Sequence, residues 1–145
     1  MLRLLGSLSL SRKFNFSRIR FNAKADIALR TLKRRSGSLP ANALSRIAFA
    51  HSLSLPDAPP PVDEEEMSTR DINRHTLLGD LEVSFLALLL QSEQANDDPD
   101  LDTLCFAHIH RGIFALLRMT ANCRGSADFS KATMAGALGK VKAVD

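Results

Sequence analysis

Apolar and polar residues alternate at the beginning of the chain with the two-residue period of a β-strand. Within residues 14–22, one face would carry Phe14, Phe16, Arg18 and Arg20, and the other Asn15, Ser17, Ile19 and Phe21. Apolar residues then recur at helical spacing over residues 23–36, at Ala25, Ala28, Leu29 and Leu32. The pattern predicts a strand that is followed directly by a helix.

Glycine and proline mark the boundaries of the next elements. Gly37 is expected to end the first helix in the left-handed conformation. Ser38 is expected to cap a second helix, with Pro40 in its first turn, that runs to about Leu53. Four prolines within residues 55–61 then break regular structure. The charged residues that follow extend this break into a linker over about residues 55–72, and Arg70–Thr76 reads as irregular.

Two longer amphipathic helices are predicted in the second half of the chain. The first covers Leu77–Gln94, an acidic loop follows at residues 96–102, and the last helix covers about 102–122. Gly112 lies inside that last helix, where glycine costs about 1 kcal/mol relative to alanine, so we expect another helix to approach closely there. The run Val83–Leu90 is more apolar than one face of a small monomer requires, which indicates a subunit contact.

These elements define a mainly α fold. An N-terminal strand-helix-helix, like that of ribbon-helix-helix proteins, is followed by two amphipathic helices, and a partner subunit is expected to complete the strand. At 145 residues the chain is expected to form one domain. We assign residues 1–13 to a disordered extension, 14–122 to a single helical domain, and 123–145 to a flexible tail.

Charge is strongly segregated along the chain. Residues 1–52 contain eleven Lys/Arg and a single acid, Asp26, whereas residues 53–103 contain thirteen Asp/Glu and only two arginines. Residues 104–145 are again basic, with six Lys/Arg and two acids. A basic segment attracts a polyanion while the acidic segment repels it, which favours one docked orientation. Trp and Tyr are absent, which disfavours a reader of single strands built on stacked aromatics.

The basic residues of the first third are therefore candidates for contact with DNA phosphates. They are Arg18, Arg20, Lys24, Arg30, Lys33, Arg34, Arg35 and Arg46. Two structural interpretations stay open beside this one. Arg18 and Arg20 can solvate an edge strand, and Lys33 to Arg35 can neutralise the dipole at a helix end.

No arrangement of residues in the sequence indicates catalysis, a metal or a cofactor. Cys105, His108 and His110 lack a fourth ligand at zinc spacing, and the two histidines diverge around a helix. His75 and Cys123 lack an orienting acid or an oxyanion loop. The two cysteines have no ligand or disulfide-framework spacing, so a reducing compartment is expected.

The N-terminus does not have the pattern of a signal peptide. The apolar stretch in Met1–Leu10 is short, and no cleavage site follows it. No later stretch approaches the roughly 18 apolar residues that cross a bilayer. We therefore expect no membrane association and a cytoplasmic, nucleoid-associated protein.

Four short blocks in order resemble the DndE family, the small subunit of bacterial DNA sulfur modification (phosphorothioation) systems. They are Arg18-Ile19-Arg20; Ala25-Asp26 with Leu29-Arg30 and Leu32-Lys33, continuing to Asn42, Leu44 and Arg46-Ile47-Ala48; Asn73 to Gly79; and Phe106 with His108 to Gly112. The resemblance spans about residues 17–117. In that family DNA contact is attributed mainly to lysines, whereas arginine dominates here.

The resemblance implies a non-enzymatic DNA-binding subunit that assembles as a tetramer and prefers nicked duplex DNA. Its partners would be double-stranded DNA, a sulfurtransferase-like protein and an ATPase, and it would need no cofactor. Two alternatives remain at this point. One is a ribbon-helix-helix repressor or antitoxin that reads one operator, and the other is an assembly adaptor that does not touch DNA.

Overall fold

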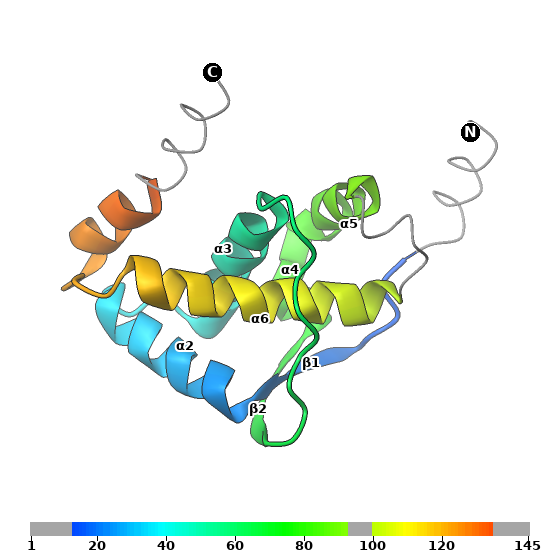
Figure 1. The fold of residues 1–145 in the computed structure, drawn as a ribbon, viewed down its shortest axis with the longest axis horizontal. Coiled ribbons are helices and arrows are strands. Elements are labelled where there is room, and N and C mark those ends of the chain that lie inside the picture. Colours follow the sequence, from blue (N-terminus) through cyan, green and yellow to red (C-terminus); the bar gives the residue numbers. More distant parts are fainter. Residues whose placement is uncertain (1–12, 93–99, 135–145) are drawn as a thin grey trace.

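The computed structural model describes residues 13–92 and 100–134. They form a mainly helical fold with a small antiparallel sheet (Figure 1). In chain order the elements are β1 (Arg18–Asn22), α2 (Ala23–Arg35), α3 (Ala41–Leu53), β2 (Met67–Asn73), α4 (Arg74–Leu78), the 3-10 turn η1 (Gly79–Leu81), α5 (Glu82–Gln91) and α6 (Leu101–Met119). Residues 126–134 are also helical. The predicted mainly α class, with one early strand, is confirmed.

The strand β1 pairs with β2 of the same chain. Arg18 lies opposite Asn73 and Ile19 opposite Ile72, with an irregularity between Arg20 and Asn22. The expectation of a strand completed only by a partner subunit is therefore wrong. The polar sequence of β2 predicts a linker and irregular structure, but one side of a two-stranded ribbon can face solvent, so its sequence need not be apolar.

Each strand ends in an asparagine that caps the next helix. The side chain of Asn22 accepts a hydrogen bond from the amide of Ala25 at 2.8 Å, and that of Asn73 accepts one from Thr76 at 2.7 Å. The cap explains why α2 follows β1 without a loop, as predicted. It also explains why α4 begins at Arg74, within the segment predicted to be irregular.

The second helix begins differently from the prediction. Pro40 occupies the N-cap position of α3 and gives no side-chain hydrogen bond, so the expected Ser38 cap is wrong. Ser38 instead has a φ of 82° and follows Gly37, whose φ is 76°. Gly37 does end α2 in the left-handed region, as expected.

The predicted Leu77–Gln94 helix is broken into α4, η1 and α5. Gly79 has a φ of 53°, which ends α4 after one turn and starts the 3-10 turn. The side chains of Leu77 and Leu78 in α4 are fully buried. In α5 the buried side chains are those of Phe85 and Leu89. The spacing of apolar residues correctly predicts helix on both sides of Gly79. Spacing alone does not show that one helix ends there and another begins.

α6 is the longest helix of the described residues, spans the molecule and packs mainly against α3 and α2 (Figure 1). Its buried face contains Cys105, Ile109, Gly112, Ile113 and Leu116, as the sequence predicts. α3 makes the most extensive helix contact with it. A Cβ placed on Gly112 would lie 1.9 Å from the carbonyl oxygen of Ala48, so the two backbones touch at this point.

The segment after α6 folds back onto the body of the protein. The amide of Gly125 donates to the carbonyl of Arg35 at 2.9 Å, and Phe129 is buried in the core. Residues 123–134, which the sequence places in a flexible tail, thus pack against the domain. The predicted extension, apart from Lys13, and most of the acidic loop lie outside the described residues.

We predict that Gly112→Ala destabilises the protein. On an isolated helix this change would be favourable by about 1 kcal/mol, but here the new methyl group meets the backbone of α3 and forces the helices apart. We expect a decrease of about 2 kcal/mol or more in the free energy of unfolding, measured by urea denaturation. Adding Ala48→Gly should not restore stability, because the nearest atom is a backbone oxygen. Unchanged or increased stability would contradict the close contact.

Candidate nucleic-acid interface

The outer face of α2 is the most basic helical surface of the first third. Lys24, Arg30, Lys33 and Arg34 are all exposed on it. Arg30 pairs with Asp26 across one helical turn at 3.2 Å. Lys33 and Arg34 form no ion pair or side-chain hydrogen bond with another described residue. Both are therefore free to meet an external anion.

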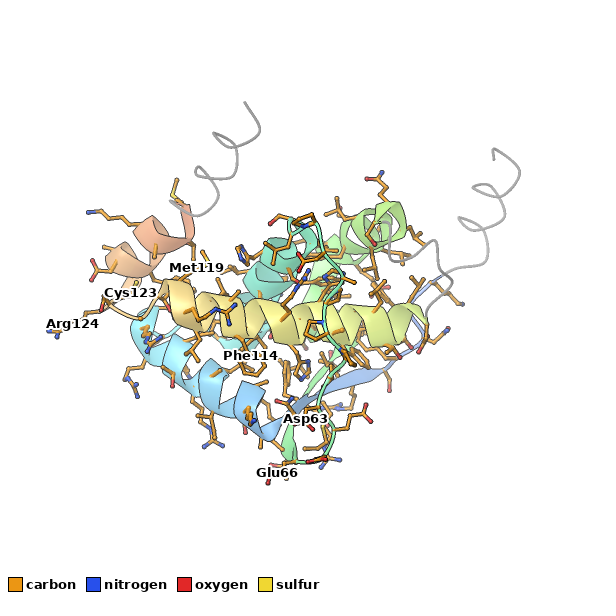
Figure 2. All side chains as sticks on the ribbon, in the orientation of Figure 1. Asp63, Glu66, Phe114, Met119, Cys123 and Arg124 are labelled. Atoms are coloured by element: carbon orange, nitrogen blue, oxygen red, sulfur yellow. The ribbon has the colours of Figure 1, made fainter. Side chains whose placement is uncertain are left out.

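The C-terminal ends of α2 and α6 meet and gather further cations. Arg35 donates from Nη1 to the carbonyl of Leu117 at 2.8 Å, and Gly125 donates to the carbonyl of Arg35. This brings two more exposed arginines, Arg118 and Arg124, to the end of α2. Figure 2 shows Arg124 at this extremity of the molecule. We call Lys33, Arg34, Arg118 and Arg124 the basic end.

Arg118 and Arg124 are not among the residues that the sequence predicts to contact DNA. The net positive charge of residues 104–145 is the available signal, but sequence distance gives no reason to join them to α2. The acidic segment lies elsewhere in the fold: Asp63 and Glu66 are at the turn before β2, well away from Arg124 (Figure 2). The basic end is therefore separated in space from the acidic turn at Asp63 and Glu66.

The other candidate residues are divided among different parts of the fold. Arg18 pairs with Asp71 at 3.0 Å, and Arg20 donates from Nε to the carbonyl of Ser68 at 2.7 Å. Lys24 shares a small cavity with Asp63, Glu65 and Glu66. These three cations lie near the sheet and the acidic turn, and not at the basic end.

Arg35 and Arg46 hold the fold together. Arg35 joins α2 to α6 through the carbonyl of Leu117. Arg46 donates from Nη1 to the carbonyls of Thr76 and Leu77, at 3.2 and 3.0 Å, and satisfies backbone acceptors at the end of α4. Both guanidinium groups bind protein carbonyls and both side chains are partly buried, so we leave them out of the proposed interface.

A buried polar cluster links α3, α6 and the segment that follows α3. Ser52 Oγ lies 2.8 Å from His108 Nδ1, and Arg111 donates to Ser52 Oγ at 2.8 Å and to the Ser52 carbonyl at 2.9 Å. A serine beside a histidine can be a nucleophile and its base. Here Ser52 is 0% exposed and His108 is 1% exposed, so no substrate reaches them. The cluster is structural.

Burial also explains the other titratable groups of α6. It raises the pKa of the Cys105 thiol well above its usual range, so this thiol is not an accessible thiolate. It lowers the pKa of His110, whose Nδ1 and Nε2 meet the Phe106 carbonyl and the Asn22 amide. Among the described residues no three His, Cys, Asp or Glu side chains come together as metal ligands. Within the same part of the chain, no helix is long and apolar enough to cross a membrane.

The comparisons with known proteins agree with this fold. Residues 18–124 match the family model described as DNA sulphur modification protein DndE. The structure is similar to that of DndE from Escherichia coli B7A, involved in DNA phosphorothioation modification, with a TM-score of 0.54 and 22% identity over 72% of this chain and 99% of that one. It is also similar to a glycine-to-lysine double mutant of DndE involved in DNA phosphorothioation, with a TM-score of 0.56 and the same identity and coverage. No curated protein matches the sequence significantly.

The buried His108 predicts a decrease in stability in acid. Burial, and then the charge of Arg111, lower its pKa to about 4, whereas a histidine in an unfolded chain titrates near about 6.5. Between these values only the unfolded chain takes up the proton. The free energy of unfolding should therefore fall as the pH drops from about 6.5 to 4, by up to about 1 kcal/mol per pH unit.

His108→Gln should make that dependence shallower in urea denaturation curves recorded across this range. Some slope should remain, because the pKa of His110 is also lowered. His75→Gln, at an exposed position, is the control and should leave the slope unchanged. Equal slopes for His108→Gln and the native protein would contradict a buried neutral imidazole.

Proposed function

The chain belongs to the DndE family of DNA sulphur modification proteins, and from this premise we propose that it is the non-enzymatic DNA-binding subunit of a phosphorothioation complex. It binds duplex DNA with little dependence on sequence and prefers nicked duplex. It acts in the cytoplasm, on the nucleoid. The sulfurtransferase-like and ATPase proteins of the system are its partners, and they carry the sulfur chemistry.

The observation that supports DNA binding most strongly is the basic end. Lys33, Arg34, Arg118 and Arg124 are exposed there. Guanidinium and ammonium groups bind phosphate oxygens, and their release of counterions from DNA supplies affinity without reading the bases. The acidic turn near Asp63 lies away from this surface, so a duplex that docks there avoids most of the negative charge.

The burial of the reactive groups of α3 and α6 supports a non-enzymatic role. Cys105 is buried, Ser52 and His108 are enclosed between the two helices, and Cys123, which follows α6, is partly buried. Transfer of sulfur needs a thiolate that can reach the donor and the acceptor. We therefore place the activation and the transfer of sulfur on the partner proteins.

The two alternative functions receive less support. A ribbon-helix-helix repressor needs a ribbon made by strands of two subunits, whereas β1 already has a partner in β2. An adaptor that does not touch DNA leaves the exposed Lys33 and Arg34 without a role. Measurements of DNA binding separate all three functions.

Arg34→Ala is expected to weaken binding to several unrelated duplexes by the same factor. For each phosphate that the protein no longer neutralises, the slope of log K against log salt should become shallower by about 0.9. Fluorescence anisotropy with labelled duplexes at a series of salt concentrations measures both quantities. Lys13→Ala is the matched control, because it removes one exposed cation from the segment that Asn15 ties to Asp102 at the start of α6.

The expected control result is a much smaller change in affinity and slope. Weaker binding to one sequence alone would favour the repressor. Binding that is absent, or that does not depend on salt, would favour the adaptor. A duplex with one nick, compared with its intact equivalent, tests the proposed preference directly.

We also propose that the protein assembles as a homotetramer and that α5 forms a subunit contact. Because β1 is paired within the chain, the support is now a set of exposed apolar side chains on η1 and α5. Val83 is 77% exposed, and Leu81 and Leu88 are about half exposed. Such a group of large apolar side chains is typical of a surface that is covered in an assembly.

Val83→Glu should therefore shift the protein towards smaller species in sedimentation velocity at micromolar concentration. A charge placed in an apolar contact costs several kcal/mol when it is left unpaired. Ile27→Glu is the control, since Ile27 is a similarly exposed apolar residue on α2. If the native protein sediments as a folded 15.9 kDa monomer, the assembly is refuted.

A further inference from the structure

A cavity of about 460 Å³ lies between β1, α6 and the segment that joins α3 to β2. We call this joining segment, residues 54–66, the crossing segment, because it passes across α6 before it reaches the sheet (Figure 1). The volume falls within the range of about 300–1,000 Å³ that is usual for small-molecule sites. Neither DNA binding at the basic end nor assembly through α5 uses this cavity.

The cavity is preformed, because each of its walls is anchored. Arg111 donates to the carbonyl of Asp57 at 2.8 Å and so holds the start of the crossing segment against α6. The Asn22 side chain donates to the carbonyl of Asp63 at 3.2 Å, and the Ala23 amide to that of Glu66 at 2.7 Å. The end of the segment is thereby fixed to β1 and α2.

Cationic, apolar and acidic side chains line the cavity together. Arg18 and Arg20 project from the same face of β1, and Phe106 and Thr103 come from α6. The crossing segment contributes Val62 and Glu64. Phe106 is half-buried and is supported by an edge contact with Phe16 at 4.9 Å between ring centroids.

The two arginines keep donors available for a ligand. Arg18 bonds to the carboxylate of Asp71 through Nη2, and Arg20 bonds to the Ser68 carbonyl through Nε. The remaining guanidinium N–H groups are suited to the oxygens of a phosphate. Each existing hydrogen bond also fixes the orientation of its side chain.

We propose that this cavity binds a single nucleoside monophosphate unit, with its phosphate at Arg18 and Arg20 and its base beside Phe106 and Val62. An aromatic ring offers a stacking surface to any base. Glu64 accepts hydrogen bonds, so it favours a base that carries an amino group, such as cytosine, over thymine. The same carboxylate repels a second anionic group, which disfavours di- and triphosphates.

The unit can come from two sources: a free nucleotide, or an unpaired nucleotide that has left the stack of a DNA strand. Binding of an unpaired nucleotide within DNA rests on the proposed DNA-binding function. Binding of a free nucleotide does not. The site alone is tested with free dCMP and dTMP and the full chain. Their binding is monitored through the NMR chemical shifts of the Thr103 and Phe106 amides. A duplex with one unpaired cytosine, compared with the fully paired duplex, tests the DNA source.

Arg20→Gln is expected to weaken the binding of dCMP about tenfold or more, because it removes charge-assisted hydrogen bonds at an exposed position that the fold tolerates. Arg34→Gln is the control: it lies outside the cavity and should leave dCMP binding unchanged while it weakens duplex binding. Glu64→Gln should bring the affinities for dCMP and dTMP closer together. A thermal melt confirms that each variant is folded.

Saturable shifts that depend on Arg20 support the cavity with a free nucleotide. A preference for the duplex with the unpaired cytosine, abolished in Arg20→Gln but kept in Arg34→Gln, supports the DNA source. If neither dCMP nor the unpaired cytosine is bound in a manner that depends on Arg20, the proposal is overturned. Because duplex binding is measured separately through Arg34, failure of the cavity and failure of the proposed function give different results.

Discussion

The close contact of Gly112 with the backbone at Ala48 fixes the position of α6 against α3, and much of the structure depends on it. Once the helices touch there, Ser52 on α3 comes opposite His108 on α6, one turn from Gly112. Arg111 then reaches both Ser52 and the carbonyl of Asp57, so the same contact holds the crossing segment. Because Gly112 has no side chain, α6 can lie against α3, and this packing determines where the wall of the cavity lies.

The same helix also creates the basic end. Arg35 reaches the carbonyl of Leu117 only because α6 continues to the place where α2 ends. Two helix C-termini carry partial negative charge there, and arginines neutralise it. At this end, neighbouring arginines have different roles: one stabilises the fold and the other is available for phosphate. The hydrogen bonds distinguish the two roles. Arg35 bonds to the carbonyl of Leu117, whereas the Arg34 side chain has no partner among the described residues.

The local elements of the fold could be predicted better than their connections. The strand that precedes α2, the stop at Gly37, the buried face of α6 and the purpose of Gly112 all follow from periodicity and backbone chemistry. Met67–Asn73 escapes prediction because a polar strand beside solvent has no apolar period. The break at Gly79 escapes it because both halves of the apolar pattern continue in phase. The strand depends on the pairing of distant segments, whereas the break depends on the local backbone conformation of Gly79.

The candidate site shows the same limit. Charge identifies Lys33 and Arg34 correctly as exposed cations of one helix end, but it cannot separate them from Arg46, whose guanidinium is bound to carbonyls of α4. Nor can it add Arg118 and Arg124, which reach this end only through the path of α6. Composition reports how many cations a segment has, whereas their availability depends on which backbone acceptors the fold leaves unsatisfied.

The two strand-ending asparagines have a consequence for how this fold can vary. An insertion or deletion inside a strand would shift its pairing relative to the asparagine that caps the next helix, and a shift of one residue turns the side chains of the strand to the opposite face. We therefore expect insertions and deletions to be disfavoured in both strands and at both strand-to-helix junctions. Loops tolerate them, and the crossing segment is the long connection between α3 and β2. The part of the chain most open to changes in length between relatives is thus also a wall of the cavity, so the shape of the cavity can diverge while the framework around it stays constant.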